Sequence, residues 1–313
     1  MLDCAIIGGG PAGLTAGLYA TRGGLKNVAL FEMGMPGGQI TKSSEIENYP
    51  GFFDSTKTGL DFMDTWQKQC FNFGLKHEMK KVESIDQTGE HFTMTLEGGE
   101  TVEAMTVIVA TGAVPRRANF KGEDEFYGRG VSTCATCDGF FYKDKPVTVL
   151  GGGDTALEEA FYLSNICSDV YVVHRRDEFR AAPPTIDRAK RKENIHFIFD
   201  SVIEESVGDK MGLSGVDIRN VKTDEITHMD NTGLFVFVGQ DVKNDVLKDA
   251  SDNFICKMSE GGQVIVDLNM KTSVPGLFVA GDLRIEAPKQ VVSAAGDGSI
   301  AALQVISYIQ EQQ

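Results

Sequence analysis

One glycine-rich pattern occurs twice in this chain, each time directly after a short apolar run and before a segment with helical spacing. Residues 8–13 read GGGPAG and residues 151–156 read GGGDTA, a separation of 143 positions (151 − 8 = 143). In both copies a second apolar run follows the helical segment, at 28–31 and at 170–173. A glycine loop inside a strand–helix–strand unit is typical of dinucleotide-binding domains. The repeat therefore predicts an α/β fold with two Rossmann-like domains built on parallel sheets.

The residue types in the first loop suit a pyrophosphate group. Gly8 permits the tight turn, Gly10 lets the backbone approach the phosphates, and Gly13 lets the helix pack closely on the strand. The free N–H groups and the positive end of the helix dipole are directed to the same place. A glycine turn without a ligand is the alternative interpretation. It leaves unexplained why both strands, the helix and an acid at the end of the second strand, Glu32, are all present.

The residue at the end of the second strand differs in charge between the two copies. The shift of 143 residues carries Glu32 to Arg175 (32 + 143 = 175). A carboxylate accepts hydrogen bonds from free ribose hydroxyls, whereas arginine binds a 2′-phosphate, so copy one is predicted to bind FAD and copy two NADPH. A solvated basic face, as we interpret the basic residues of 188–192, is the alternative, and the repeat register argues against it at Arg175 and Arg176. The predicted NADPH-binding residues are Gly151, Gly153, Asp154, Thr155, His174, Arg175, Arg176 and Arg180.

The second copy ends in the same way as the first. The segment LFVFVG at 234–239 parallels the apolar segment at 107–112, and a third such segment, LFVAGD, follows at 277–282. A last helix with many small residues is predicted over 291–309. Asp282, at a strand end beside a glycine, is expected to accept hydrogen bonds from the hydroxyls of a polyol chain, here the ribityl chain of FAD.

The two domains are therefore predicted to be nested. Residues 1–115 and 242–313 would form the two parts of an FAD-binding domain, and residues 116–241 would form an inserted NADPH-binding domain. Small antiparallel meanders are expected beside the parallel sheets, among them a hairpin at Gly98-Gly99 and a meander over 216–229.

Two cysteines, Cys134 and Cys137, with two residues between them, lie shortly before the second glycine loop. This spacing can close a small disulfide ring and is typical of dithiols that exchange electrons in pairs. Zinc would need two further ligands, but the other cysteines (4, 70, 167 and 256) are isolated and the histidines (77, 91, 174, 196 and 228) form no pair. We therefore predict a redox centre and no metal site. An inert buried disulfide is a further alternative, which a reducing cytoplasm disfavours.

The charge and the apolar runs limit the possible partners. The formal net charge is −15, which repels nucleic acid and anionic membrane surfaces. The N-terminus lacks a basic n-region, and no apolar run reaches the length of about 18 residues that a membrane helix needs. We expect a soluble cytoplasmic protein that binds neither nucleic acid nor membrane.

Six motifs taken together make the chain similar to a known family. GGGPAG, ATG, CATCDG, GGGDTA, HRRDEFR and AGD, in this order and spacing, resemble the bacterial low-molecular-weight thioredoxin reductases, over essentially the whole chain. The resemblance implies a homodimeric flavoprotein in which electrons pass from NADPH to FAD, to the cysteine pair and to thioredoxin. One departure is visible, because many members carry a G-x-x-P-N stretch where this chain has GQDVKN at 239–244, without the proline.

The resemblance also implies roles for individual residues. Cys137 would lie nearer the flavin, Cys134 would attack the disulfide of thioredoxin, and Asp138 would act as the acid/base. Positions that match residues lining FAD in the family are Gln39, Asn48, Asp282, Gln290 and Val291. Together with residues of the glycine loop and of the strand ends, they give the full set of predicted FAD-binding residues. These are Gly8, Gly10, Gly13, Glu32, Gly38, Gln39, Asn48, Val82, Thr111, Gly112, Gly281, Asp282, Gln290 and Val291.

The position of the cysteines suggests a motion and leaves rival functions to be tested. The cysteines and the nicotinamide site belong to the same predicted domain, yet both must reach one flavin held by the other. We therefore expect a rotation about linkers near 114–117 and 240–245.

Three rival functions are left to be tested. The first is a flavin dithiol oxidase, which would not need the arginines. The second is a flavoprotein of a peroxide-reducing system, which normally has an extra N-terminal domain. The third is a nucleotide-sensing module without turnover.

Overall fold

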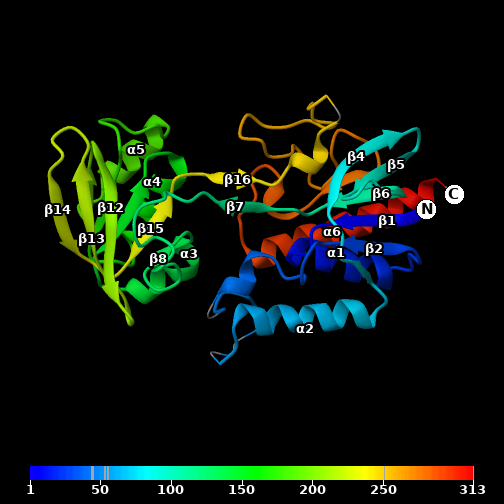
Figure 1. The fold of residues 1–313 in the computed structure, drawn as a ribbon, viewed down its shortest axis with the longest axis horizontal. Helices are drawn as coiled ribbons and strands as arrows, with labels where there is room; N and C mark the ends of the chain where they lie inside the picture. The colour runs from blue at the N-terminus through cyan, green and yellow to red at the C-terminus, as the bar shows by residue number, and fades with distance from the viewer. Residues whose placement is uncertain (44–45, 53, 55, 250, 313) are drawn as a thin grey trace. The chain divides into compact units, whose positions relative to one another are not determined.

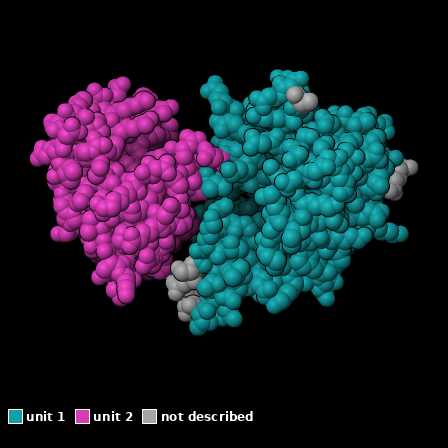
Figure 2. Space-filling model, in the orientation of Figure 1, with its two compact units in different colours: residues 1–114, 242–313 teal, residues 115–241 magenta. Residues whose placement is uncertain are grey.

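The computed structural model describes residues 1–43, 46–52, 54, 56–249 and 251–312. The chain forms two compact units, coloured teal and magenta in Figure 2. Unit 1 consists of Met1–Val114 and Val242–Gln313, and unit 2 consists of Pro115–Asp241. Each unit is described by itself below, with the element labels of Figure 1.

Unit 1 is built on a parallel sheet whose central strand is the first strand of the chain. The parallel strands, in spatial order, are β3 (Lys76–Glu78), β2 (Val28–Phe31), β1 (Leu2–Ile7), β6 (Thr101–Val109) and β17 (Leu277–Val279). The register places Ile7 opposite both Phe31 and Val109, so the ends of the three strands lie level. This edge is where the first glycine loop leaves β1. The apolar runs at 28–31, 107–112 and 277–282 each contribute to a strand of this sheet, but β6 begins at Thr101, six residues before its run.

Helices cover one face of this sheet and an antiparallel meander covers the other. The helices are α1 (Pro11–Arg22), α2 (Gly59–Asn72) and α6 (Val291–Glu311), with short 3-10 turns η1 (Gln39–Lys42) and η4 (Gly281–Leu283). A further turn, η3 (Asp245–Leu247), packs on the meander side, against β4. The meander consists of β4 (Val82–Thr88) and β5 (His91–Leu96), which pairs with the first half of β6. Ile6 packs in the core on the helix side, while its neighbours Ala5 and Ile7 pack on the meander side. Because both faces are buried, the strands appear in the sequence as continuous apolar runs.

Unit 2 repeats this three-layer arrangement. Its parallel strands, in spatial order, are β11 (Ile195–Ile198), β10 (Val170–Val173), β9 (Val147–Gly151), β15 (Leu234–Phe237) and β8 (Val131–Ser132). The helices are α3 (Ala135–Asp138), α4 (Asp154–Leu163) and α5 (Pro183–Lys190), with the 3-10 turn η2 (Gly139–Tyr142). The meander is β12 (Ser201–Asp209), β13 (Gly212–Asn220) and β14 (Ile226–Asp230), visible beside the sheet in Figure 1.

The structural repeat extends one strand beyond the sequence repeat. In unit 1, β6 lies between β1 and β17, and in unit 2, β15 lies between β9 and β8. The strand β8 therefore occupies in unit 2 the place that β17 occupies in unit 1, although β8 precedes its glycine loop in the chain and β17 follows its own. Because of this exchange of chain order, the segment that follows β8 corresponds in position to the segment that follows β17, which contains Gly281 and Asp282.

The two segments that connect the units are short strands. β7 (Ala113–Pro115) pairs with β16 (Gln240–Val242). Beside this ladder the amide of Arg116 donates to the carbonyl oxygen of Gly239 at 3.0 Å, and its guanidinium contacts one oxygen of Asp241 at 2.7 and 2.9 Å. The sequence indicated only polar boundaries here, because three-residue strands carry no periodicity of their own. Among the residues that the structure describes, no helix has the length and apolar character needed to cross a membrane.

Candidate redox disulfide and nucleotide-binding loops

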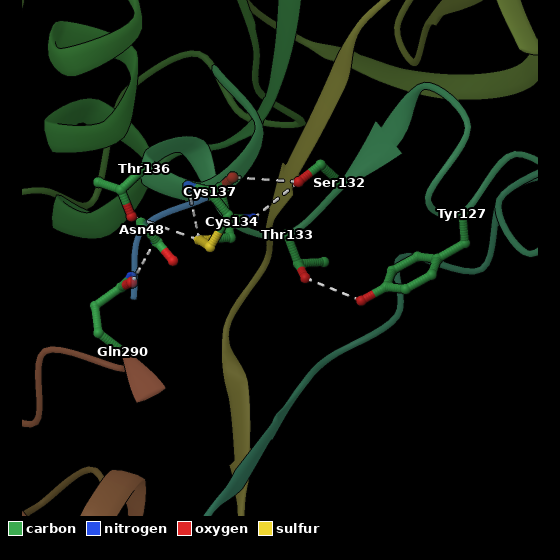
Figure 3. The surroundings of a disulfide bond; sticks show 8 residues. All are labelled: Asn48, Tyr127, Ser132, Thr133, Cys134, Thr136, Cys137 and Gln290. Atoms are coloured by element: carbon green, nitrogen blue, oxygen red, sulfur yellow. Dashed lines mark hydrogen bonds between the residues drawn. A yellow bond between two sulfur atoms is a disulfide. The ribbon is translucent and has the colours of Figure 1, made fainter. Parts of the chain in front are cut away.

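A disulfide joins Cys134 and Cys137 at the carboxyl end of β8, as Figure 3 shows. The two Cα atoms lie 5.3 Å apart. Cys134 is the N-cap residue of α3, and its sulfur accepts a hydrogen bond from the amide of Cys137 at 3.2 Å. The predicted pairing of these two cysteines is confirmed. The strand and the helix N-terminus together fix the backbone on both sides of Cys134.

The remaining cysteines are buried thiols. Burial raises the pKa of Cys4 and Cys70 to about 12, and that of Cys167 and Cys256 to about 11. A thiol with such a pKa is protonated at neutral pH and therefore a poor nucleophile. No group of three or more potential metal ligands occurs among the described residues.

Asp138, the predicted acid/base, ends helix α3 and is half-buried. Burial raises the pKa of its carboxyl group, and a hydrogen bond with Ser132 partly opposes this rise. Tyr142 lies near it, and burial together with the charges of Asp138 and Cys167 raises the pKa of Tyr142 to about 12. Asp138 is therefore a carboxyl group that can hold a proton nearer to neutral pH than an exposed aspartate does.

The first glycine loop, between β1 and α1, has the shape that a pyrophosphate requires. Gly8 has φ of +104°, in the left-handed region. A Cβ atom on Gly13 would lie 1.9 Å from the carbonyl oxygen of Gly8, so the helix can approach the strand only because residue 13 is glycine. Gly10, the N-cap residue of α1, has nothing nearer to such an atom than 3.9 Å. The loop is thus tight where it packs on the protein and open where a ligand would approach.

Glu32 is held at the end of β2 by the loop itself. One carboxylate oxygen accepts from the amide of Gly9 at 2.9 Å, and the other accepts from the amide of Gly34 at 3.3 Å. The amide of Gly37 donates to the carbonyl oxygen of Gly9, which brings the Gly38-Gln39 segment against the loop. These bonds fix the carboxylate beside the glycine loop and leave its remaining lone pairs for ribose hydroxyls.

Other predicted FAD-binding residues gather at the N-terminus of α6. Asn48 donates from its amide to the Gln290 side chain at 3.1 Å, across 242 positions of sequence. Gln290 is the N-cap residue of α6 and Val291 is its first residue. Burial raises the pKa of Asp282 to about 6. A Cβ atom on Gly298 would lie 2.1 Å from the carbonyl oxygen of Ala12, so α6 and the first turn of α1 are in direct contact.

Sequence reasoning missed the buried ion pair that supports Asp282. Arg284 donates to both carboxylate oxygens of Asp297, at 2.6 and 3.1 Å, and the amide of Gly281 donates to Asp297 at 3.1 Å. Asp297 is 6% exposed. The only signal in the sequence was an aspartate on the otherwise apolar face of a helix.

Three predicted FAD-binding residues have structural contacts instead of open polar groups. The hydroxyl of Thr111 donates to the carbonyl oxygen of Lys243, and the carbonyl oxygen of Gly112 accepts from the Lys243 amide at 3.0 Å. Both therefore anchor the chain where it re-enters unit 1. Val82 is buried in the core between the sheet and the meander, so only its backbone is available to a ligand.

The second loop, between β9 and α4, resembles the first in its packing. A Cβ atom on Gly151 would lie 2.6 Å from the carbonyl oxygen of Phe237, whereas one on Gly153, the N-cap residue of α4, would meet nothing within 4 Å. The carboxylate of Asp154 accepts from the amide of Ala182 at 2.8 Å and from the Thr185 hydroxyl at 3.0 Å. Asp154 thus fastens the segment before α5 to the loop. Thr155 is exposed at the start of α4.

Three arginines lie exposed after β10, namely Arg175, Arg176 and Arg180. In the part of the chain that the structure describes, none of them forms an ion pair with a carboxylate. The amide of Arg180 donates to the carbonyl oxygen of Gly152, so these side chains belong to the rim of the glycine loop. In a chain of net charge −15, unpaired guanidinium groups at this position favour an anionic ligand.

His174 is the buried member of this group. It is 7% exposed, and its ring packs so closely on Gly152 that a Cβ atom there would lie 2.2 Å from it. Burial lowers the pKa of His174, and the charges of Arg176, Arg175 and Arg180 lower it further. A backbone hydrogen bond at Glu178 acts in the opposite direction and raises that pKa. The imidazole is therefore neutral at neutral pH and shapes the loop, while the arginines supply the positive charge.

Gly153→Ala separates ligand binding from folding. We expect the KM for the nucleotide of unit 2 to rise at least about tenfold, because the added methyl group occupies the space through which phosphates approach the backbone. The free energy of unfolding should fall by about 1 kcal/mol or less, the cost of alanine at an N-cap position. Nucleotide titration and thermal unfolding of the same sample measure both quantities.

Gly296→Ala is the matched control, since a Cβ atom there also meets nothing within 4 Å but Gly296 lies in α6 of unit 1. It should leave the KM for that nucleotide unchanged. Unchanged nucleotide binding in Gly153→Ala would contradict the assignment of this loop.

A redox disulfide on a unit that repeats a dinucleotide-binding fold defines a class of proteins. Residues 2–298 match the family described as pyridine nucleotide-disulphide oxidoreductase, and the chain belongs to this family. The expected α/β fold with two dinucleotide-binding domains is thereby confirmed.

Within this family the similarity is to thioredoxin reductases. The chain is 60% identical over 310 residues to the thioredoxin reductase of Helicobacter pylori (strain J99 / ATCC 700824), covering 99% of each chain. Among solved structures, the thioredoxin reductase from Streptococcus pyogenes MGAS5005 has 40% identity, a TM-score of 0.92 and 99% coverage of both chains. That from Giardia duodenalis has 37% identity, a TM-score of 0.91 and 98% coverage of both.

Proposed function

We propose that this protein is a thioredoxin-disulfide reductase that passes electrons from NADPH through FAD to Cys134 and Cys137 and then to thioredoxin. The observation that carries the proposal is that the disulfide and the second glycine loop lie at the carboxyl ends of strands of one parallel sheet, β8 and β9. Ligands of open α/β sheets bind at this edge. The relatives named thioredoxin reductase support the choice of substrate.

The residues of unit 1 fit FAD. The open backbone at Gly10 suits the pyrophosphate, the fixed carboxylate of Glu32 suits the ribose hydroxyls, and Asp282 suits the ribityl chain. The side chains of Asn48 and Gln290 would orient the remaining part of the cofactor. When bound, FAD supplies a two-electron carrier between a nicotinamide and a disulfide.

The residues of unit 2 fit NADPH. The backbone at Gly153 and the N-terminus of α4 would hold the pyrophosphate, and Arg175 and Arg176 would bind the 2′-phosphate. When bound, NADPH supplies the hydride. NADH lacks that phosphate, so unpaired arginines at this position favour NADPH.

The chain's own residues carry the exchange with the partner. In the reduced protein the Cys134 thiolate attacks one sulfur of the partner disulfide, which forms a mixed disulfide and releases one partner thiolate. The Cys137 thiolate then attacks the Cys134 sulfur, which restores the Cys134–Cys137 bond and releases the second partner thiolate. Burial raises the pKa of Asp138, and its carboxyl group would be the proton donor for a departing thiolate. Two thiols are oxidised and one partner disulfide is reduced.

Two exposed surfaces support the proposed partners. Phe140 and Phe141, directly after the CxxC motif, are 66% and 46% exposed and offer an apolar surface to an incoming thioredoxin. Val292, Ile300 and Leu303 lie exposed along α6 and would be covered in a homodimer. We place this assembly in the cytoplasm, where thioredoxin works as a dithiol.

The proposal includes a rotation between the two half-reactions. The predicted flavin site belongs to unit 1, and both the disulfide and the predicted nicotinamide site belong to unit 2. We expect that one rigid unit does not present both groups to the same ring in a single pose. Rotation of unit 2 about the paired segments near 114–117 and 240–245 would bring each to the flavin in turn.

The test is a turnover assay of the holoprotein with NADPH and oxidised thioredoxin in the absence of oxygen. We expect one NADPH consumed for each thioredoxin disulfide reduced. A dithiol oxidase would instead leave its flavin oxidised with NADPH and consume oxygen with a dithiol. A nucleotide-binding module would show no turnover with either, and both outcomes would contradict the proposal.

A further inference from the structure

Asp297 is a carboxylate on the buried face of α6, where its neighbours are small residues such as Ala294 and Gly298. One of its oxygens accepts from the amide of Gly281 at 3.1 Å and from Nε of Arg284 at 2.6 Å. The other accepts from Nη2 of Arg284 at 3.1 Å. These donors belong to the turn η4 and to its C-cap residue, so the carboxylate joins α6 to this turn.

The ion pair of Asp297 with Arg284 is closed within the protein. A further nitrogen of the guanidinium, Nη1, donates to the carbonyl oxygen of Ile285 at 3.0 Å. A buried ion pair contributes little net stability compared with apolar residues of the same size, because both charges lose their hydration. Its directed hydrogen bonds, in contrast, select one geometry. The effect of this pair is therefore expected in the shape of the turn more than in the free energy of unfolding.

The turn that Asp297 holds leads directly to Asp282. Gly281 has φ of +76°, in the left-handed region, and a Cβ atom on it would lie 3.1 Å from the Cβ of Ala12 in the first glycine loop. Asp297 fixes the amide of Gly281, and the amide of Arg284 donates to the carbonyl oxygen of Gly281 at 3.1 Å. Both peptide groups that flank the Cα atom of Gly281 are thus held, and the second of them is the peptide of Asp282.

We propose that Asp297 is a positioning residue for FAD, which acts through Gly281 and so orients Asp282 toward the ribityl chain. Arg284 neutralises the charge of Asp297, which allows a carboxylate to be buried at this place. The proposal rests on the FAD site proposed above for unit 1. Asp297 itself is buried and contacts the turn, so its effect on the cofactor is indirect.

The test is the Kd for FAD of two double variants, measured by flavin fluorescence on the full-length protein stripped of its flavin. Asp297→Leu with Arg284→Met and Asp297→Asn with Arg284→Met both remove the two charges, and leucine and asparagine are similar in size. Only asparagine keeps an oxygen that can accept from the amide of Gly281. We expect a Kd about tenfold higher with leucine than with asparagine, the effect of losing this one hydrogen bond.

The same comparison in an Asp282→Asn background separates positioning from a general structural role. If Asp297 acts through the carboxylate of Asp282, the difference between the two double variants should shrink to about threefold or less once that carboxylate is gone. A purely structural contribution would keep its full size in this background, because it does not depend on the side chain of Asp282.

Glu123→Leu is the matched control in unit 2. Glu123 is also buried, and its carboxylate accepts from the amides of Ala118 and Asn119 at 3.1 and 2.6 Å. Its loss should lower the temperature of unfolding and leave the Kd for FAD unchanged. A similar rise of that Kd in Glu123→Leu would show that loss of any buried acceptor weakens FAD binding, and would overturn the proposal.

Equal values of the Kd in the two double variants, or an undiminished difference in the Asp282→Asn background, also overturn it. If the variant with leucine does not fold, Asp297→Ala with Arg284→Met takes its place in the comparison. The assay uses neither NADPH nor thioredoxin. A protein that shows the expected pattern and fails to reduce thioredoxin would therefore count against the proposed function alone, whereas a wild-type protein that binds no FAD would overturn both.

Discussion

Cys134→Ser is expected to abolish thioredoxin reduction while NADPH still reduces the bound flavin. A serine hydroxyl is not ionised at neutral pH and cannot form a disulfide with the partner, so turnover should fall by at least about three orders of magnitude. Folding should be little affected, because Cys134 lies at a helix N-cap, a position that serine favours. Anaerobic bleaching of the flavin by NADPH and turnover with thioredoxin, measured on one preparation, separate the two half-reactions.

Cys137→Ser serves as the matched variant. It should also lose turnover, but it leaves the Cys134 thiol able to attack, so a mixed disulfide with thioredoxin should accumulate and appear in the intact mass. Cys167→Ser is the control for a thiol that takes no part, since burial raises the pKa of Cys167 to about 11. A mixed disulfide that forms in Cys134→Ser and not in Cys137→Ser would reverse the proposed order of the two cysteines.

The elements that could be predicted from the sequence are those whose pattern is local. The strands at 28–31 and 170–173 were predicted at the bounds that the structure shows. Both lie in parallel sheets covered on two faces, so every residue is apolar and the run stands out from its neighbours. The cysteine pair was equally local, since three positions separate the two sulfurs.

What escaped prediction depends on contacts between distant segments. The two residues of β8 form a strand only because they pair with Leu234 and Phe235, about a hundred positions later in the chain. The ion pair of Arg284 with Asp297 and the packing of His174 on Gly152 are of the same kind. No hydrophobic periodicity or sequence motif predicts such pairs, because the two residues come together only when the backbone is folded.

The contacts of the predicted site residues divide them into two groups. Asp154 and Thr111 hold neighbouring segments in place, whereas Gly153 and the arginines after β10 leave their polar groups open. A sequence motif selects both groups, since both are needed for the loop to exist. Only the second group offers unsatisfied groups to a ligand, and mutations there should change binding more than stability.

Replacing both Arg175 and Arg176 by glutamine is expected to remove the preference for NADPH. Each hydrogen bond between an arginine and a phosphate contributes about 1.5–3 kcal/mol, so losing both should raise the KM for NADPH by about two to three orders of magnitude at an exposed site. The KM for NADH should change little, because NADH has no 2′-phosphate to lose contact with. Steady-state kinetics with both nucleotides measure the ratio of the two kcat/KM values directly.

Arg188→Gln is the matched control within the same unit. The Arg188 guanidinium stacks 3.9 Å above the Phe161 ring and is not among the predicted NADPH-binding residues, so this variant removes one positive charge and leaves Arg175 and Arg176 in place. It should leave the preference for NADPH intact. An equal loss with NADPH and NADH in the double variant would indicate only a general electrostatic effect. No loss at all would mean that Arg175 and Arg176 form a solvated face, and that the exchange of Glu32 for Arg175 between the two repeats does not distinguish the nucleotides.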